Sequence, residues 1–352
     1  MAVMLSAATL GGQVQPPAAP QGDPATGHSA RTAIERWFDV QAAALMARYR
    51  RIETSDGTVN ANHLQDGLLL RVRVKFDRKA RYALNAGVAT GPAFTAAWNN
   101  AGWGTGGPRT TGVYLKQLFL SAAPVRGLDL AYGSLGFVRG ESTEITTFDN
   151  DGYMAGARAT VKRPADLVLD EISVTAGYVG DLATPGFSDR ADGLGRANYF
   201  HVLGGKKIGA LLNASADYTH LSGAGILRGA VHLRTPRVRV VDAVRYEQYC
   251  RSRQLPACGF AATLDKTVAT RVTLSGGYAD IDADYGNTNA DRFMRGRRFF
   301  EMVTVRVLRD LAVSAFAAQA VHNAFVVPNG RRFDLVVTFN ALGPLQRAGL
   351  FR

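Results

Sequence analysis

Apolar and polar residues alternate one by one along most of this chain from Leu45 onward. The clearest example is Leu68–Phe76, where Leu70, Val72 and Val74 alternate with Arg71, Arg73 and Lys75. A helix would spread these charges around its circumference, whereas a strand places all of them on one face. The pattern therefore predicts β-strands with one apolar face and one charged face.

The same alternation recurs often enough to predict about sixteen strands and an all-β fold. The expected strands are Leu45–Glu53, Leu68–Phe76, Arg81–Val88, Val113–Ala122, Leu128–Val138, Tyr153–Lys162, Glu171–Gly180, Asn198–Gly204, Ala210–His220, Ile226–Arg234, Arg237–Tyr249, Gly259–Leu264, Val268–Ala279, Arg298–Leu308, Leu311–Val321 and Arg332–Ala341. Ahead of the first strand, Ala33–Ala44 could equally form a short helix. The strand Arg237–Tyr249 puts Asp242 on the apolar face, which a β-bulge would correct.

Long and short connections alternate between these strands. Long loops are expected at Thr54–Asp66, Gly91–Thr110, Arg139–Asp151, Asp181–Ala197 and Asp280–Arg297, with turns such as Asp265–Thr267 between them. A short connection at Leu221–Gly225 interrupts the rule. Transmembrane barrels show this asymmetry, with short periplasmic turns and longer external loops. A soluble sandwich has no reason for it.

Two-faced strands of this kind need lipid on one side and water on the other. Closing the sheet pairs every backbone N–H and C=O, and an open edge would aggregate. About sixteen strands leave room for an aqueous interior. We therefore expect residues 36–352 to form a transmembrane antiparallel β-barrel in the bacterial outer membrane, with outer-membrane lipid as its surroundings.

Composition narrows the function. The 352 residues carry a net charge of +12, and the mean hydropathy is −0.05. No apolar stretch approaches the roughly 18–20 residues of a transmembrane helix, which excludes a helical bundle. The positive charge favours anionic partners. Nucleic acid is not expected, because the charges are spread over many strands and match no recognition module.

The charged phase of each strand predicts the residues that line the interior. An arginine on the lipid face near the bilayer midplane would cost about 2–4 kcal/mol, so these residues should face water. They could form a basic ladder that favours anions, or they could be ordinary interior charges paired with acids. The set is Arg71, Arg73, Lys75, Arg158, Lys162, Arg228, His232, Arg234, Arg239, Arg271 and Arg306.

The loop after the fifth expected strand concentrates four acids, Glu141, Glu144, Asp149 and Asp151. In this it resembles the bacterial porins, in which the loop after strand five folds inward and its acids face a basic wall. The resemblance implies a constriction, although this loop is shorter than is typical and could be a plain surface loop or, less in keeping with its sequence, a Ca²⁺ loop. Tyr114–Leu120 and Leu128–Gly133, within Val113–Arg163, are also similar to channels of the alginate-export type, which implies no substrate.

Both ends of the chain carry export signals. Ala2–Leu10 looks like the apolar core of a signal peptide whose start lies upstream, and Pro16–His28 looks like a linker, so residues 1–35 are expected outside the barrel. Phe333–Phe339 resembles the C-terminal signal that the barrel-assembly machinery reads, although Asn340–Arg352 continues past it.

Cys250 and Cys258 are eight residues apart in one external loop, which favours a disulfide in an oxidising compartment.

No residue pattern calls for catalysis, a cofactor or a metal. Gly-x-Ser-x-Gly and phosphate-binding glycine loops are absent. The nearest approach to a hydrolase site is His220 with Ser222 and Asp217. The sequence thus predicts a passive, porin-like channel for small hydrophilic solutes. Two alternatives stay open, an outer-membrane hydrolase and a non-conducting structural or adhesion barrel, and homotrimer formation is also undecided.

Overall fold

The computed structural model describes residues 37–93, 96–143, 152–162, 168–181, 183–221, 223–252, 257–282, 296–321 and 330–348. Wholly within these residues lie seventeen strands and two short helices: β1 (Phe38–Glu53), β2 (Val59–Lys75), β3 (Tyr82–Thr90), β4 (Asn99–Gly104), β5 (Val113–Ala122), β6 (Leu128–Gly136), β7 (Tyr153–Lys162), β8 (Glu171–Tyr178), η1 (Ser188–Gly193), β9 (Tyr199–Ile208), β10 (Leu212–Leu221), β11 (Ala224–Arg234), β12 (Ala243–Ser252), β13 (Ala257–Ala269), β14 (Val272–Ile281), β15 (Gly296–Leu308), β16 (Leu311–Ala320), β17 (Arg331–Asn340) and α2 (Leu342–Arg347). No helix among the described residues is long and apolar enough to cross a membrane.

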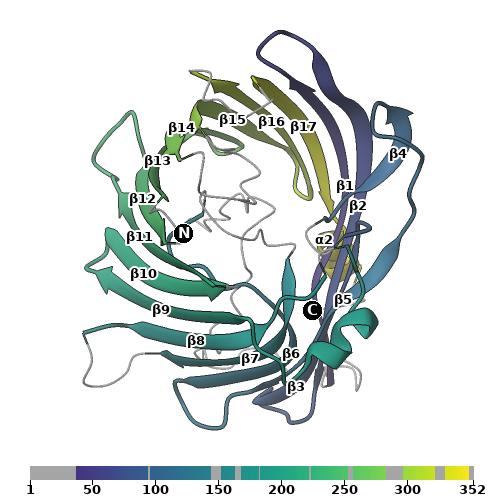
Figure 1. Ribbon diagram of the computed structural model, residues 1–352, viewed down its shortest axis with the longest axis vertical. Helices are drawn as coiled ribbons and strands as arrows, with labels where there is room; N and C mark the ends of the chain where they lie inside the picture. The colour runs from purple at the N-terminus through teal and green to yellow at the C-terminus, as the bar shows by residue number, and fades with distance from the viewer. Residues whose placement is uncertain are drawn as a thin grey trace.

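Sixteen of these strands form one closed antiparallel barrel (Figure 1). Each strand pairs with its neighbours in sequence, and β1 pairs with β17 from Ala44↔Asn340 to Glu53↔Arg331, which closes the ring. The short strand β4 is not counted among the sixteen. Among the described strands it pairs with β2 alone, alongside the part of β2 that β3 no longer reaches after Thr90. The predicted fold class and strand number are confirmed.

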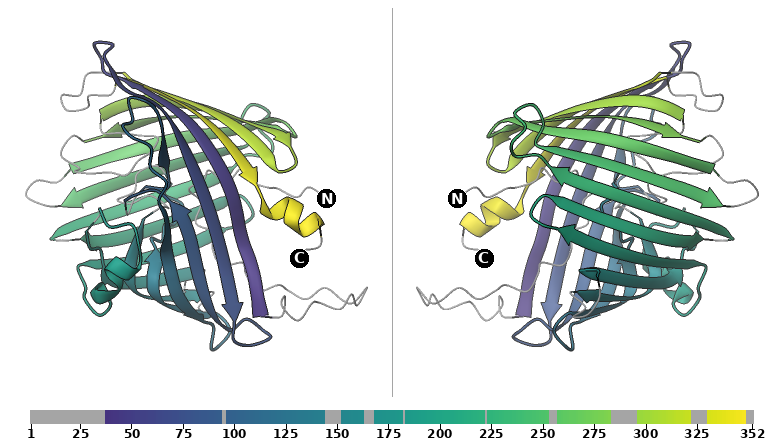
Figure 2. Two further views of the ribbon diagram at one scale, coloured as in Figure 1. Left: turned by 90° about the vertical axis from the view of Figure 1, so that its right-hand side faces the viewer. Right: turned by 90° about the vertical axis from the view of Figure 1, so that its left-hand side faces the viewer.

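The two ends of the barrel differ, as the connections predicted. The end that carries the start of β1 and α2, the terminus end, has turns such as 270–271 and 309–310. The opposite end, the loop end, carries the longer connections 91–98, 137–152 and 179–198 (Figure 2). Arg347 of α2 forms an ion pair with Asp310 in the β15–β16 turn, so the chain beyond β17 is fastened to the terminus end.

Three predicted loops and turns were wrong. The loop expected at Thr54–Asp66 is a tight connection in which the Thr54 N–H donates to the Thr58 carbonyl at 2.8 Å, and β2 already begins at Val59. The loop expected at Gly91–Thr110 contains β4. The turn expected at Asp265–Thr267 lies at residues 270–271, because β13 continues to Ala269.

Three further predicted strands were misplaced at their starts by four residues or more, including the one expected from Val268, because β14 begins only at Val272. β1 begins at Phe38, seven residues before Leu45, so residues 38–44 of the stretch Ala33–Ala44 are strand. The strand expected from Arg237 begins only at Ala243. Asp242 therefore lies in a connection and no bulge is needed. Its carboxylate accepts from Lys266 Nζ at 2.8 Å and from the Thr267 N–H at 2.7 Å, which holds that connection in place.

The predicted disulfide between Cys250 and Cys258 is present. The two cysteines lie directly opposite each other on β12 and β13, so they are strand residues rather than loop residues. Their side chains lie on the outer face of the barrel, as do those of Tyr246 on β12 and Leu264 on β13, which are 41% and 48% exposed.

The alternation of exposure along the strands separates an apolar outer face from a polar inner face. On β2, Leu70 and Val74 are each 37% exposed, whereas Lys75 is 9% exposed. Exposed apolar residues follow the same phase on the other strands, including Val174, Leu227, Val231, Val303 and Leu335. The outer face is thus a continuous apolar band, as a surface in contact with hydrocarbon requires.

Two adjacent leucines on β2 test this division, because Leu70 is on the outer face and Leu69 on the inner face. We expect Leu70→Arg to lower the free energy of unfolding in lipid vesicles by about 2–4 kcal/mol, since its guanidinium would meet hydrocarbon. Leu69→Arg should cost about 1 kcal/mol or less, because its guanidinium reaches interior water. Urea unfolding followed by tryptophan fluorescence measures both. Equal losses for the two variants would refute the assignment of faces.

Candidate functional site

The interior wall of the barrel, the lumen face, is the candidate functional site. Arg71, Arg73 and Lys75 lie on it because they alternate with the exposed Leu70 and Val74 and with Val72 between them. By the same alternation, the structure places six further predicted residues on this face, namely Arg158, Lys162, Arg228, His232, Arg234 and Arg306. Arg239 and Arg271 lie instead in connections at the terminus end, where both are exposed.

Several lumen-facing cations were missing from the sequence prediction. Buried Arg48, Lys116, Arg298 and Arg332, together with Arg50 and Arg245, share the inner phase of their strands. The period-two pattern could have found Arg48 and Arg50, which alternate with Leu45, Ala47 and Tyr49 once β1 is recognised as a long strand. Lys116 could not be found in this way, because a register shift in β5 breaks the alternation beside it.

Part of the basic wall is neutralised by acids on neighbouring strands. Lys75 Nζ lies 2.7 Å from Asp39 Oδ1, and Lys162 Nζ lies 2.7 Å from Asp129 Oδ2. Arg50 Nη2 lies 3.0 Å from Asp334 Oδ2, a carboxylate that Arg332 also binds. For these cations the interpretation as ordinary paired interior charges fits.

Arg71 and Arg73 differ, because no described carboxylate lies within 4.0 Å of either guanidinium. Arg73 Nε donates instead to the neutral Asn85 Oδ1 at 3.1 Å. Neighbouring Asp39 is bonded to Lys75. The β2 wall therefore presents two guanidinium groups without an ion pair to a described acid, although Asp39 lies opposite Arg73 on β1 and interacts with its charge.

A first inward segment lies between β3 and β4, in residues 91–98. The Nζ atom of Lys116, a buried residue of β5, donates to the carbonyls of Ala93 and Ala96. The Thr90 hydroxyl donates to the Ala97 carbonyl at 2.7 Å. Trp98 lies 4.3 Å below the Arg48 guanidinium, a cation–π contact. These contacts hold the described part of the segment against the lumen face.

A second inward segment, residues 137–143, is the start of the acidic loop. Phe137 packs edge-on against Tyr199 of β9, with ring centroids 5.2 Å apart. The Glu141 N–H then donates to Ser215 Oγ of β10 at 2.7 Å. Gly140 is required beside it, because a Cβ there would lie 2.3 Å from Ser215 Oγ.

The end of this segment reaches β11 and β12. The Glu141 carboxylate lies 3.4 Å from His232 Nδ1. The Thr143 N–H donates to Glu247 Oε1 at 3.4 Å, and Arg245 Nη1 donates to the Thr143 hydroxyl at 3.1 Å. Residues 137–143 therefore cross the lumen face from β9 to β12. The other predicted constriction residues, Glu144, Asp149 and Asp151, lie outside the described residues.

Beneath the second inward segment is a buried polar cluster. Asp217 Oδ1 lies 2.8 Å from Arg228 Nη2 and 3.3 Å from His201 Nε2, and all three side chains are at most 5% exposed. His220, the base considered for a hydrolase, belongs to the opposite, exposed phase of β10. Asp217 and His220 therefore face different sides of the sheet, and Ser222 lies outside the described residues.

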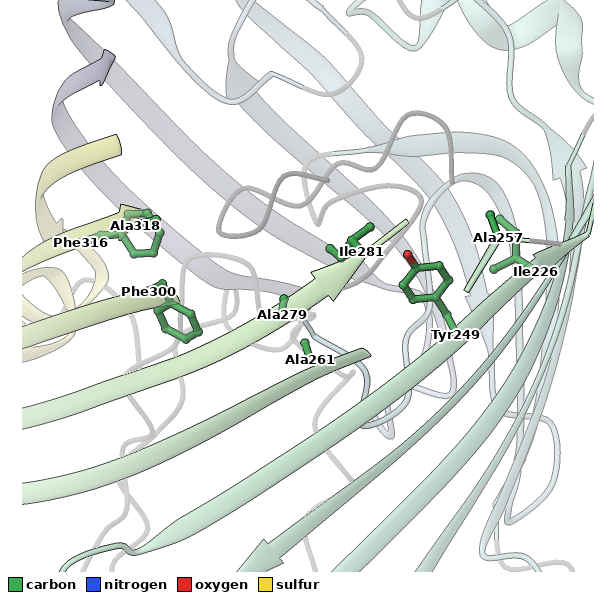
Figure 3. Packing of buried hydrophobic residues seen from close by; sticks show 9 residues of the cluster. All are labelled: Ile226, Tyr249, Ala257, Ala261, Ala279, Ile281, Phe300, Phe316 and Ala318. Atoms are coloured by element: carbon green, nitrogen blue, oxygen red, sulfur yellow. The ribbon is translucent and has the colours of Figure 1, made fainter. Parts of the chain in front are cut away.

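The lumen face is not polar throughout. A patch of buried apolar side chains runs along β11 to β16 (Figure 3), made of Ile226, Tyr249, Ala257, Ala261, Ala279, Ile281, Phe300, Phe316 and Ala318. Arg332 stacks over Phe316 at 5.3 Å, so the patch borders the basic wall of β17 and β1. Charged side chains such as Arg228, Glu247 and Arg298 lie on the same strands, so the patch is an apolar area within a charged wall.

Comparison with solved structures identifies the fold. No protein-family model matches the chain, and no curated protein matches it. Similar structures include Salmonella typhi OmpF in complex with daunomycin (TM-score 0.57, 9% identity, 87% of this chain and 98% of that one). Acinetobacter baumannii OccAB3 gives a TM-score of 0.54 at 11% identity, covering 85% of this chain and 98% of that one. A mutant of the Rh. blastica porin gives 0.53 at 10% identity, covering 86% and 99%. This chain therefore has the porin fold.

Glu141 gives the second inward segment a dependence on pH. A hydrogen bond with the His232 imidazole is the largest cause that lowers the pKa of the Glu141 carboxyl below 4.5, and the charges of His232, Arg245 and Lys207 lower it further, while burial opposes them. A lowered pKa means that the ionised carboxylate stabilises the folded state. That stabilisation is present above pH 4.5 and is lost as the pH falls below it.

We expect Glu141→Gln to lower the free energy of unfolding by about 1 kcal/mol at pH 7, because a charge-assisted hydrogen bond is lost. The difference from the native chain should shrink as the pH falls below 4.5, because the native carboxyl then becomes protonated as well. Urea unfolding at several pH values measures this difference. A difference that stays constant between pH 7 and pH 3 would contradict the Glu141–His232 contact.

Proposed function

We propose that this chain is a channel of the bacterial outer membrane through which small hydrophilic solutes diffuse passively, with a preference for anions. The observation that carries the proposal is the pair of guanidinium groups, Arg71 and Arg73, on the lumen face without an ion pair to a described acid. The porin fold and the apolar outer band support a position in lipid, and the connections support short turns on the periplasmic side.

The mechanism needs no covalent chemistry. The barrel sets the largest solute that can pass, and the inward segments 91–98 and 137–143 reduce the open cross-section at the loop end. Positive charge on the β2 wall lowers the energy of an anion there and raises that of a cation, because low-dielectric walls concentrate the field in a water-filled passage. Glu141 and the acids beyond it would supply the opposing charge of a constriction.

Two other functions are less well supported. A hydrolase built on His220 would need its acid on the same face, and Asp217 lies on the other face of β10. An unchanged lipase or protease assay after His220→Ala would dismiss it. Deleting residues 1–35 tests the alternative of a non-conducting barrel that these residues close. Conductance should rise after the deletion only if residues 1–35 plug the lumen.

The proposed partners follow from the same placement. They are outer-membrane lipid on the apolar band, small hydrophilic solutes in the lumen and the barrel-assembly machinery at β17, in which Phe339 is the next-to-last residue. A homotrimer is part of the proposal because many porins assemble in this way. No cofactor or nucleic acid takes part.

Removing the two unpaired charges tests the anion preference. We expect Arg71→Gln with Arg73→Gln to lower the chloride-to-potassium permeability ratio by at least about threefold, since even in water a unit charge at 4 Å is worth about 1 kcal/mol. The reversal potential of single channels in a KCl gradient measures the ratio.

The matched control is Arg51→Gln, which removes a cation from the outer phase of β1, where Arg51 binds Glu53. It should leave the ratio unchanged. A native channel that prefers potassium, or a double variant with the native ratio, would overturn the anion preference. Absence of any conductance would overturn the channel itself.

A further inference from the structure

The barrel wall has one seam where the backbone ladder is missing. β5 and β6 pair only from Phe119↔Gly133 to Ala122↔Leu130. Toward the loop end, β5 continues to pair with β3, from Leu118 to Val113, and β6 continues to pair with β7 up to Gly136. Between Val113–Leu118 and Ser134–Gly136, the two strands therefore share no backbone ladder.

Side chains and one loop close this seam. Ser134 Oγ donates to the Lys116 carbonyl at 2.7 Å, and the Gln117 amide reaches toward Gly136. The two strands separate at Gly133, which has a φ of +136° and where a Cβ would lie 2.3 Å from the Leu118 carbonyl oxygen. The seam is thus a built feature of the wall, since any other residue at Gly133 would be strained.

A strap, described at residues 179–181 and 183–198, spans the outer side of the seam (Figure 1). It leaves β8, crosses to β5 and places the Phe187 N–H 2.8 Å from the Leu115 carbonyl; η1 lies next to β5 in Figure 1. Buried Arg190 holds the strap together through the carbonyls of Thr184 and Asp181 and contacts the Tyr153 carbonyl at 3.5 Å. One backbone hydrogen bond therefore connects the described strap to β5.

The lumen side of the seam is apolar, whereas Ser134 and Gln117 place polar groups in the seam and Arg190 places one under the strap. Leu135 and Phe137 form one buried cluster with Tyr153, Met154, Val179 and Tyr199, and Phe119 packs against it from the lumen face. On β7, the side chain of Tyr153 lies on the same outer face as that of Val161. Tyr153 is nevertheless only 4% exposed, because it lies at the end of β7 next to the strap. Apolar contacts therefore continue from the lumen side of the seam to the part of the outer face beside the strap.

We propose that the seam between β5 and β6 is a lateral exit, through which uncharged apolar molecules pass between the lumen and the surrounding lipid when the strap moves. Apolar side chains offer such molecules a dry path, whereas ions would lose their hydration there. Side-chain contacts can part without breaking a ladder, which is why the path would be at this seam and not at the fully paired strands. This inference rests on the proposed position in the outer membrane.

Linking the seam tests the exit. Gln117→Cys with Gly136→Cys places two thiols on opposite sides of the seam, and a short bismaleimide joins them. The native cysteines do not react with it, because both are in the disulfide. The control pair, Ala157→Cys with Ala176→Cys, lies directly opposite on the paired β7–β8 ladder. Uptake of the uncharged dye N-phenyl-1-naphthylamine by cells of a Gram-negative host measures the lateral path, and chloride conductance in planar bilayers measures the axial path.

We expect the linked seam to reduce dye uptake several-fold with conductance retained, and the linked control to change neither. Dye uptake that is unchanged after complete linking, in a channel that still conducts, would overturn the lateral exit and leave the proposed channel intact. A chain that never conducts but still loses dye uptake on linking would overturn the channel and leave the exit.

A second variant tests the strap without new cysteines. Arg190→Ala removes the contacts that hold the strap, so dye uptake should rise several-fold while chloride conductance stays the same. The matched control is Asp189→Ala, an exposed neighbour in the same helix η1. Native dye uptake in the Arg190→Ala variant would refute the strap as the cover of the exit.

Discussion

Closure of the backbone ladder is the constraint on which the rest of this structure depends. In hydrocarbon, a strand edge would leave N–H and C=O groups without partners at a cost of several kcal/mol each, so a sheet can lie there only as a closed ring. Pairing of β1 with β17 supplies that closure. Once the ring is closed, each strand has one inner and one outer face, and a single phase of the sequence decides which side chains meet water. The charges of Arg71 and Arg73 reach the lumen for this reason and not through local contacts of their own.

The places where the ladder is interrupted are also the places where the chain enters the lumen. β3 gives way to the first inward segment at Thr90, and the second inward segment begins directly after β6 at Gly136. At both places side chains replace the missing backbone partners. Lys116 takes part in both, since its ammonium group binds the first segment while its own carbonyl accepts from Ser134. The proposed narrowing of the lumen and the seam in the wall therefore both arise where the backbone ladder is interrupted.

The sequence predicted the strands better than their ends. Period-two alternation places Arg158 and Arg228 correctly because a strand has only two faces, and a run of five residues is enough to fix the phase. The same pattern misled at Arg239, where Arg237–Val241 alternates like a strand. There Asp242 binds Lys266 and the Thr267 N–H, and Thr235 donates to Val241, so hydrogen bonds within the connection outweigh the local preference for strand.

The contacts within the lumen could not be predicted, because they depend on register between strands far apart in sequence. Arg50 meets Asp334 only because β1 pairs with β17 in one register, and a shift of one residue would turn the carboxylate outward. Glu141 meets His232 only because residues 137–143 cross from β9 to β12, which no local pattern encodes. The acids of this loop could be recognised from composition, whereas the wall that receives them could not.

Water decides how an axial and a lateral path can exist in one barrel. An ion in the lumen keeps most of its hydration, and the β2 guanidinium groups only adjust its energy. At the seam, Leu135, Phe137 and Met154 offer no hydrogen bonds, so a hydrated ion would have to lose its shell and stays in the lumen. An apolar molecule gains from the same side chains, because each buried CH₂ group contributes about 0.8 kcal/mol. In the two proposals the solute classes would therefore be separated by dielectric environment, and ions would stay in the lumen when the strap opens.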